Sequence, residues 1–246
     1  MSINSDNKKK QTLLIKISGE SFKGTTTNVD PEKIDSIALQ IKELQKKCNV
    51  GVVIGGGNII RGAKWKANQV RRTTADQMGM MATIINCLAL RDTLQSYDVK
   101  TIMYTLIPMP SIAHTYSIND MLKNINEGNV IIFAAGTGNP YFSTDTGIAL
   151  RTLETDADIV LMGKTGVDGI YSSDPRIDAN AERFEKISFD QALEKNLQVM
   201  DQTAVCLMRN SHAKILVFNA NRKNCYIDVM EEKIPYTIVY SKDEVK

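Results

Sequence analysis

Three consecutive glycines separate an apolar run from an arginine in the segment VVIGGGNIIRG, residues 52–62. Because glycine lacks a Cβ atom, the chain can turn there with a positive φ, and backbone N–H groups can closely approach a ligand. An anion is the ligand that such donors favour, and the Arg61 guanidinium would add a charged fork for phosphate. A tight strand-to-helix connection that binds nothing has the same pattern, so the segment by itself leaves both interpretations open.

Two lysines near the ends of apolar runs could supply charge to a phosphate site. Lys16 alternates with Ile15 and Ile17, so we expect its ammonium group to point away from the apolar side chains. Lys164 follows the apolar run DIVLM. Phosphoryl transfer requires mainly positive charge on the moving group and two oxygens held in line. Two lysines facing each other across a glycine-lined cleft would meet this requirement, although a lysine in a strand is commonly a solvated edge charge.

Two common nucleotide-binding motifs are absent from the sequence. The P-loop pattern GxxxxGK[ST] fails before Lys164, because Asp158 stands where the pattern requires its first glycine. The dinucleotide-binding pattern GxGxxG fails because Ile60 replaces its third glycine. Asp76 lies about 20 residues beyond the triplet, as a ribose-binding acid would, but its surroundings indicate a helix rather than a strand end. A dehydrogenase therefore remains a weak alternative.

The chain alternates apolar runs with amphipathic segments, which predict strands and helices. We predict strands at residues 12–18, 50–54, 99–106, 129–135, 158–162, 214–220 and 235–241, and helices at 30–48, 74–95, 117–128, 187–196 and 200–213. In the first helix Asp30 is the expected N-cap, and one stripe contains Ile34, Ile37, Ala38, Ile41 and Leu44. Continuous apolar strands separated by helices predict a mostly parallel sheet covered on both faces, a three-layer α/β/α fold.

Ligands of such sheets bind at the carboxyl ends of the strands, where this chain has unusual loops. Four predicted strands lead into SGES at 18–21, GGGNIIRG at 55–62, GTGNPYFSTDTG at 136–147 and GKTGVDGIYSSDP at 163–175. All but the first are rich in glycine, and none is an ordinary short connection. We therefore expect a wide site that holds more than one phosphorylated group.

Composition limits the class of protein. With 246 residues, 43% hydrophobic and 24% charged, the chain fits one large α/β domain or two tightly joined lobes. Its net charge of +2 gives no broad positive field, so we expect no nucleic-acid partner. The four cysteines form no CxxC pair, and no segment approaches the roughly 20 apolar residues of a membrane span. We expect a cytoplasmic protein without a membrane partner, preceded by a flexible tail at residues 1–11.

Five segments occur in an order that closely resembles the bacterial-type UMP kinases (uridylate kinases), a branch of the amino acid kinase superfamily. They are KISGE, GVVIGGGNIIRG, DQMGMMAT, GTGNPYFSTDT and VDGIYSSDP, and the resemblance extends from about Thr12 to the C-terminus. GGGN and the VDG–DP segment recur across the superfamily, in acetylglutamate, glutamate and aspartate kinases. DQMGM and GTGNPYFSTD narrow the match to the UMP kinase branch. The resemblance implies the amino acid kinase fold and transfer of the γ-phosphoryl group of ATP to UMP.

The resemblance also implies roles for individual residues on the ATP side. Lys16 and Lys164 would stabilise the moving phosphoryl group, Asp145 would orient them, and Arg61 would reach the phosphates. The residues similar to the ATP-binding positions are Lys16, Ile17, Ser18, Gly19, Gly57, Arg61, Thr165, Tyr171 and Asp174. The stretch before the VDG motif varies in length within the family, which leaves the alignment of Lys164 and Thr165 open. Simple packing is the alternative for Tyr171.

On the acceptor side, the resemblance implies that UMP contacts Gly56, Asp76, Thr137, Gly138, Asn139, Pro140, Tyr141, Phe142, Ser143 and Thr144. Asp76 would accept hydrogen bonds from the ribose hydroxyls, and an acid that favours the helix dipole is its alternative. Asp201 is either a second assisting carboxylate or an exposed N-cap.

The family also suggests cofactors, partners and organisation. We expect Mg²⁺ to be carried with ATP, since no carboxylate cluster marks a metal site, and UTP to inhibit. An acceptor and oligomerisation lobe is expected at residues 12–157, and an ATP lobe at 158–246. The long helix at 74–95 carries more apolar residues than one buried face requires, which predicts a homo-oligomer, and the resemblance implies a hexamer.

The sequence leaves two alternative functions open. The chain could phosphorylate a small acid such as glutamate or aspartate, or it could be a non-catalytic nucleotide-sensing module of the same fold.

Activation by GTP, common among bacterial relatives, is expected to be weak or absent. Ile102, Glu127 and Asn129 occupy the region where phosphate-binding arginines are expected.

Overall fold

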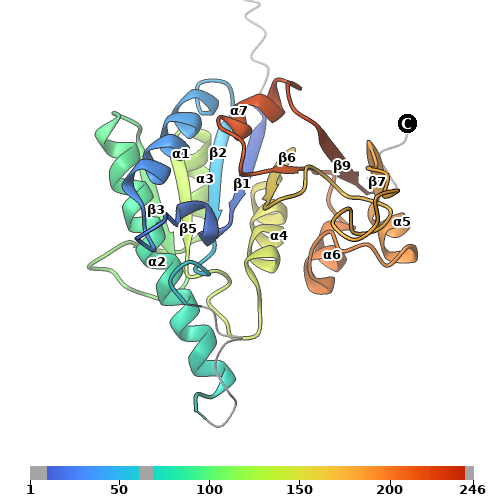
Figure 1. The fold of residues 1–246 in the computed structure, drawn as a ribbon. Coiled ribbons are helices and arrows are strands. Elements are labelled where there is room, and N and C mark those ends of the chain that lie inside the picture. The colour runs from blue at the N-terminus through green and yellow to red at the C-terminus, as the bar shows by residue number, and fades with distance from the viewer. Residues whose placement is uncertain (1–9, 61–68, 242–246) are drawn as a thin grey trace, which may run out of the picture.

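A nine-stranded sheet forms the centre of the computed structural model, which describes residues 10–60 and 69–241. The strand order is β4-β3-β5-β2-β1-β6-β8-β9-β7 (Figure 1). The strands are β1 (Thr12–Ile17), β2 (Asn49–Ile54), β3 (Thr101–Thr105), β4 (His114–Thr115), β5 (Val130–Ala134), β6 (Ile159–Lys164), β7 (Lys186–Ser188), β8 (Lys214–Asn219) and β9 (Tyr236–Tyr240). Most of the predicted N-terminal tail lies outside the described residues.

The sheet is mostly parallel, as the sequence predicts. Only β8 and β9 run antiparallel among the neighbouring strands of the described chain. Every residue of β2 and β5 is buried, because both faces of these strands are covered by helices. One continuous sheet runs through both predicted lobes, since β1 pairs with β6 in parallel.

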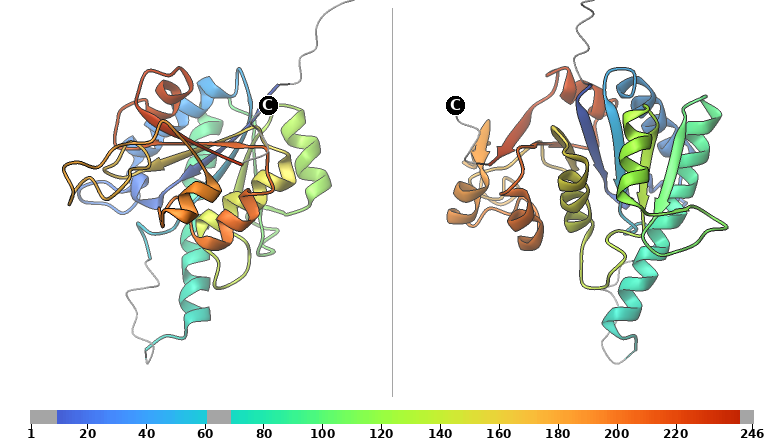
Figure 2. Two further views of the ribbon diagram at one scale, coloured as in Figure 1. Left: turned by 90° about the vertical axis from the view of Figure 1, so that its right-hand side faces the viewer. Right: turned by 180° about the vertical axis from the view of Figure 1, so that it is seen from behind.

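Helices cover the two faces of the sheet in the predicted three-layer arrangement (Figure 2). The helices are α1 (Pro31–Leu44), α2 (Arg72–Ser96), α3 (Ile118–Asn126), α4 (Thr144–Thr155), α5 (Phe189–Glu194), α6 (Gln202–Met208) and α7 (Cys225–Met230), and η1 (Gly19–Phe22) is a 3₁₀ turn. Two hydrophobic cores result, one beneath α1, α2 and α7 and the other beneath α3 to α6. Side chains of β1 alternate between them, with Ile15 and Ile17 in the first core and Leu14 in the second.

The first helix forms as its sequence predicts. Asp30 is the N-cap and accepts a hydrogen bond from the Glu32 amide at 2.9 Å, while Pro31 fits the first helical position. The whole predicted stripe, from Ile34 to Leu44, is buried against the sheet. Burial of each large aliphatic side chain contributes about 1.5–3 kcal/mol, so packing rather than helix propensity holds α1 in place.

The long helix α2 extends beyond the sheet. Figure 1 shows that its N-terminal part projects past the carboxyl edge of the strands, beside the loop that joins β5 to α4. The helix begins at Arg72, two residues earlier than predicted, and ends at Ser96. None of the helices within residues 10–60 and 69–241 combines the length and apolar character needed to span a lipid bilayer.

Candidate active site

Each of the four unusual loops follows the carboxyl end of a strand, and these four strands are neighbours in the sheet. In the order β5-β2-β1-β6 these strands are parallel, so their carboxyl ends lie at one edge. The loops that the sequence singles out are therefore brought together at one place. This is the edge at which parallel α/β sheets bind ligands.

Lys16 and Asp145 form an ion pair at this edge. Lys16 shares a face of β1 with Leu14, and α4 packs against that face. Its Nζ lies 3.1 Å from Asp145 Oδ1, and the two side chains are 18% and 24% exposed. Lys16 is thus a paired and largely covered charge, which excludes the interpretation as a solvated edge lysine.

Local sequence fixes the position of Asp145. Ser143 is the N-cap of α4, and its Oγ accepts hydrogen bonds from the amides of Asp145 at 2.9 Å and Thr146 at 3.3 Å. Asp145 consequently lies in the first turn, where the helix dipole favours a carboxylate.

Lys164 completes a cluster of three charges. It is the last residue of β6 rather than a loop residue, and its Nζ donates a hydrogen bond to the Gln198 carbonyl at 2.7 Å. Burial lowers the pKa of Lys164; the Asp145 carboxylate opposes this shift and the Lys16 ammonium adds to it. Two lysines and one carboxylate therefore interact electrostatically at the same edge.

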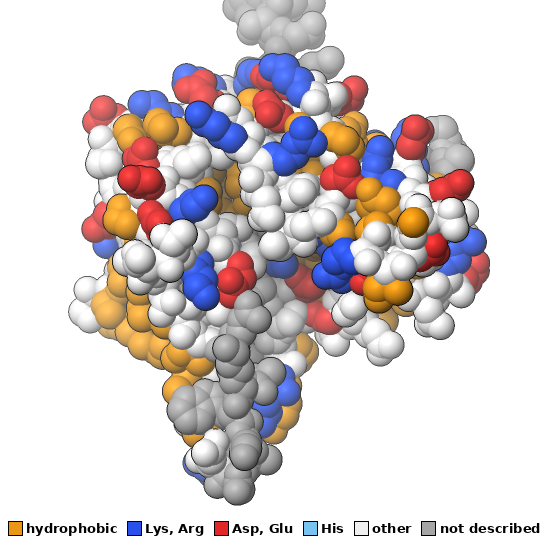
Figure 3. Space-filling view, viewed as in Figure 1, with side chains coloured by type: hydrophobic (Ala, Val, Ile, Leu, Met, Phe, Trp, Pro, Cys, Tyr) orange, Lys and Arg blue, Asp and Glu red, His pale blue; other side chains and the backbone are white. Residues whose placement is uncertain are grey.

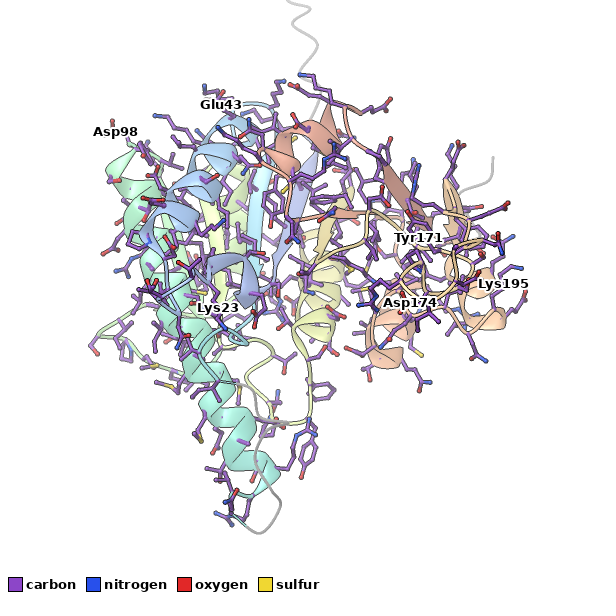
Figure 4. All side chains as sticks on the ribbon, viewed as in Figure 1. Lys23, Glu43, Asp98, Tyr171, Asp174 and Lys195 are labelled. Carbon is purple, nitrogen blue, oxygen red and sulfur yellow. The ribbon has the colours of Figure 1, made fainter. Side chains whose placement is uncertain are left out.

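A cavity of about 620 Å³ opens beside the lysines. Of the expected ATP-binding residues, it is lined by Lys16, Ser18, Thr165, Tyr171 and Asp174, and Lys164, expected to be catalytic, lines it too. The loop at residues 195–198 forms another wall, and Figure 4 shows Tyr171, Asp174 and Lys195 on this side of the molecule. The Ile17 side chain is buried in the core, which leaves only its backbone for a ligand.

Two expected ATP-binding side chains have partners within the chain. Asp174 accepts hydrogen bonds from Arg176 Nε at 2.9 Å and Nη2 at 2.7 Å, which lower the pKa of Asp174 to about 2. Tyr171 donates a hydrogen bond to Asp168 Oδ1 at 2.6 Å, and this bond raises the pKa of Tyr171. Arg176 also lines this cavity, although the motifs do not predict it.

A second, smaller cavity of about 250 Å³ lies between α2 and the loop after β5. Of the expected UMP-binding residues, it is lined by Gly56, Asp76, Thr137, Asn139, Phe142, Ser143 and Thr144. Gly57, expected on the ATP side, also lines this cavity. Gly138, Pro140 and Tyr141 lie in the same loop but do not line it.

Asp76 connects α2 to that loop. Both carboxylate oxygens pair with Arg72 Nε, at 2.9 and 2.8 Å, and Oδ2 accepts a hydrogen bond from the Tyr141 amide at 2.8 Å. Arg72 in turn lies 5.6 Å from the centre of the Tyr141 ring. Because α2 begins at Arg72, Asp76 lies beyond the first turn, and the interpretation as a helix-dipole acid is wrong.

The glycine triplet fulfils a different need from the one expected of it. The prediction of positive φ is wrong, since none of Gly55, Gly56 and Gly57 has φ in the left-handed region. Close packing requires Gly56 instead, because a Cβ there would lie 2.7 Å from the Gly79 carbonyl oxygen of α2. A Cβ at Gly57 would meet no atom of the described residues within 4 Å, so close packing does not require glycine at this position.

Comparison with known proteins decides the family. The model of the Amino acid kinase family matches residues 11–219. The chain belongs to the amino acid kinase family. This confirms the fold class and superfamily that the motifs predict.

Relatives of this amino acid kinase match it over nearly its whole length. A protein named uridylate kinase from Ureaplasma parvum serovar 3 is 47% identical over 232 residues, covering 94% of this chain and 99% of the relative. The crystal structure of UMP kinase from Ureaplasma parvum superposes with a TM-score of 0.91 at 47% identity, with the same coverage. UMP kinase from Bacillus anthracis superposes with a TM-score of 0.89 at 31% identity, covering 95% of this chain and 97% of that one.

Asp201 links α6 of this amino acid kinase to the site. It is the N-cap of α6, where it accepts a hydrogen bond from the Ala204 amide at 2.9 Å, as one of the two interpretations predicts. The same carboxylate also accepts hydrogen bonds from the hydroxyls of Ser143 and Thr146. Burial acts to raise the pKa of Asp201, but these hydrogen bonds outweigh it and lower the pKa. The cap is half-buried rather than exposed.

Three further observations concern the site of this amino acid kinase. Arg61 lies outside the described residues. Within the described parts of the chain, no group of three His, Cys, Asp or Glu side chains is arranged to hold a metal ion. The sequence does not predict the role of Arg72, because the predicted helix begins two residues after it; on α2 Arg72 lies four residues before Asp76, the spacing at which ion pairs form.

Proposed function

We propose that this amino acid kinase transfers the γ-phosphoryl group of ATP to UMP, forming UDP and ADP for pyrimidine nucleotide synthesis. The cluster of Lys16, Lys164 and Asp145 carries the proposal. Both lysines line the larger cavity, and Asp145 directly follows Thr144, which lines the smaller one. The similarity to uridylate kinases and UMP kinases over more than nine-tenths of the chain supports UMP as the acceptor.

The two cavities divide the substrates in this proposal. ATP occupies the larger cavity, in the lobe at residues 158–246 together with the backbone of Ser18 and Gly19. UMP occupies the smaller cavity in the lobe at 12–157, with its ribose hydroxyls donating to Asp76. On the family resemblance, Arg61 is the further residue proposed to bind the phosphates.

The chemistry requires charge and alignment from the chain. An oxygen of the UMP phosphate attacks the γ-phosphorus, and the bond from this phosphorus to the bridging oxygen of ADP breaks. Lys16 and Lys164 offset the negative charge of the transferring group, and Asp145 holds Lys16 in place by its ion pair. A fixed positive charge needs no reorganisation during the reaction, so it stabilises the transition state more than the bound substrates.

Mg²⁺ enters this proposal with ATP. The ion neutralises phosphate charge when it is bound, and kinases commonly hold it by one or two carboxylates and the substrate phosphates. Asp145 supplies one carboxylate at the site, which fits such a donor set. UTP is the proposed inhibitor, because its uridine fits the acceptor cavity while its additional phosphates extend toward the ATP side.

We also propose that α2 contacts a second copy of the chain. Met81 and Ile85 lie one helical turn apart and are 43% and 49% exposed. Figure 3 shows hydrophobic side chains gathered along α2, away from the charged parts of the same surface. An apolar face of this kind on a long helix favours burial against a symmetric partner. A hexamer is the assembly that the family resemblance implies.

Release of ADP with a panel of acceptors tests the proposed activity. We expect turnover with ATP and UMP, and slower turnover with CMP or dUMP. Turnover with glutamate or aspartate but not with UMP would identify a kinase of small acids. Nucleotide binding without ADP release would identify a sensing module instead.

A further inference from the structure

A third cavity lies on the face of the molecule formed by α1 and α7. Its volume of about 590 Å³ is close to the roughly 620 Å³ of the larger cavity at the active site. Its walls come from three parts of the chain: η1 with Lys23, one side of α1, and the loop from β8 into α7. Figure 4 shows Lys23 at the end of η1 on this face. None of the substrates of the proposed reaction is assigned to this space.

Positive charge is concentrated around the third cavity. Its lining contains the basic residues Lys23, Lys33, Arg222 and Lys223 and the acidic residues Glu20 and Glu32. No carboxylate within residues 10–60 and 69–241 forms an ion pair with any of the four basic side chains. The chain as a whole carries only +2, so this excess of two positive charges around one cavity is a local feature.

The floor of the third cavity is polar and fixed. Gln40 is buried, its side-chain amide donates to the Ser36 carbonyl at 3.1 Å, and its Oε1 accepts a hydrogen bond from the Tyr226 amide at 2.9 Å. The Tyr226 side chain is buried beside Gln40. Four lysine and arginine side chains above a polar floor suit a small phosphorylated molecule, because ammonium and guanidinium groups bind phosphate oxygens strongly.

Thr165 connects the third cavity to the active site. It follows Lys164 directly, and it lines both the third cavity and the larger active-site cavity. Thr165 is therefore a shared wall residue of the two cavities. A ligand that shifted this residue from one cavity would alter the wall of the other, and such coupling would be reciprocal.

We propose that the third cavity is an effector site for a small phosphorylated anion, and that Thr165 couples its occupancy to ATP binding. The recognised chemistry is a chain of two or three phosphate groups, held by Lys33 of α1 and by Arg222 and Lys223 of the loop from β8 into α7. The binding step does not depend on the proposed kinase activity, so the two ideas fail or succeed separately.

Calorimetric titration with inorganic tripolyphosphate tests the site. The protein is first saturated with UMP and a non-hydrolysable ATP analogue, so that both active-site cavities are filled. We expect one further tripolyphosphate per chain, with affinity at least about ten-fold lower in Lys33→Ala and Arg222→Ala. Lys46→Ala is the matched control, since Lys46 pairs with Glu43 outside the cavity and its loss changes the net charge equally.

The results separate the possible outcomes. Absence of binding to the saturated protein, or equal binding by all three variants, would overturn the proposal. A nucleoside triphosphate that binds the saturated protein more tightly than tripolyphosphate identifies a nucleotide effector. Equal affinity identifies the phosphate groups alone as the recognised element. Coupling is measured as a change in the affinity for the ATP analogue when tripolyphosphate is present, and this change should disappear in Arg222→Ala.

Discussion

The Asp76 carboxylate accepts a hydrogen bond from the Tyr141 backbone amide at 2.8 Å, although the two residues are 65 positions apart. This contact holds the projecting end of α2 against the loop that covers the smaller cavity. Arg72 pairs with the same carboxylate, so Asp76 is fixed from two sides before a nucleotide arrives.

Replacing this carboxylate should weaken binding of the acceptor. We expect Asp76→Asn to raise KM for UMP by about 10- to 100-fold, because a hydrogen bond to a charged acceptor is replaced by one to a neutral amide. KM for ATP should change little. Steady-state kinetics check this, with Asp98→Asn as a control at the opposite end of α2. A loss of affinity for ATP instead would show that the substrates are assigned to the wrong cavities.

Lys16 should act mainly on the transition state. We expect Lys16→Ala to lower kcat at least about 100-fold while the fold survives, because a positioned charge next to the transferring group is worth several kcal/mol. Circular dichroism verifies the fold, and Lys46→Ala controls for the loss of one charge. A kcat close to that of the unaltered protein would show that Lys16 takes no part in phosphoryl transfer.

The lowered pKa of Lys164 predicts a pH dependence. Its protonated form carries the useful charge, and this form is depleted as pH rises through a pKa that lies below the ordinary lysine range. The alkaline fall of kcat/KM for ATP, which reports the free enzyme, should therefore begin below that range. Lys164→Arg should shift the fall to higher pH, because a guanidinium stays charged. An unchanged profile in this variant would assign the fall to another group.

The exposed face of α2 predicts the oligomeric state. Light scattering at micromolar concentration should give the mass of an oligomer for the unaltered chain. The double variant Met81→Glu with Ile85→Glu should give smaller species, because two carboxylates would be buried in the contact. Leu193→Glu is the control, since Leu193 is similarly exposed, at 41%, but lies on α5. A monomeric mass for the unaltered chain would refute the oligomer.

GTP should activate weakly or not at all. A cavity of about 290 Å³ near the end of α2 contains Ile102, which offers no charge. Arg91 also lines it, but its Nε pairs with Asp92 at 2.8 Å and its Nη1 donates to the Ile112 carbonyl at 3.0 Å. Initial rates at subsaturating UMP, with and without millimolar GTP, measure the effect. Several-fold activation that persists in Arg222→Ala, in which the third cavity is impaired, would show that Arg91 or Lys123 can form an effector site after all.

Much of the fold is predictable from local patterns. Continuous apolar runs locate the buried parallel strands, and the stripe from Ile34 to Leu44 defines α1 because its period matches the helix. Short elements such as β4, β7 and α7 escape prediction, since two to six residues carry too little periodicity. Their positions depend on pairing with distant segments, as in the contact of β7 with β9.

The site is predictable only in part, for a related reason. Motifs place Lys16, Asp145 and Lys164 at loop and strand ends, and the parallel sheet brings them together. One partner comes from a segment without a motif, since Lys164 donates a hydrogen bond to the Gln198 carbonyl. Asp201, whose role the sequence leaves open, accepts a hydrogen bond from Ser143, the N-cap that positions Asp145. Gly56 shows the same limit, because its need for a small side chain arises from the approach of α2 and not from its own φ.

Transfer of labelled phosphate tests the central claim most directly. The protein is incubated with Mg²⁺, UMP and ATP labelled in the γ-phosphoryl group, and the labelled product is identified by chromatography. We predict that the label appears in UDP in a one-to-one ratio with ADP, and that Lys16→Ala slows this transfer at least about 100-fold. Label recovered as inorganic phosphate or on an amino acid, with none in UDP, would contradict the account.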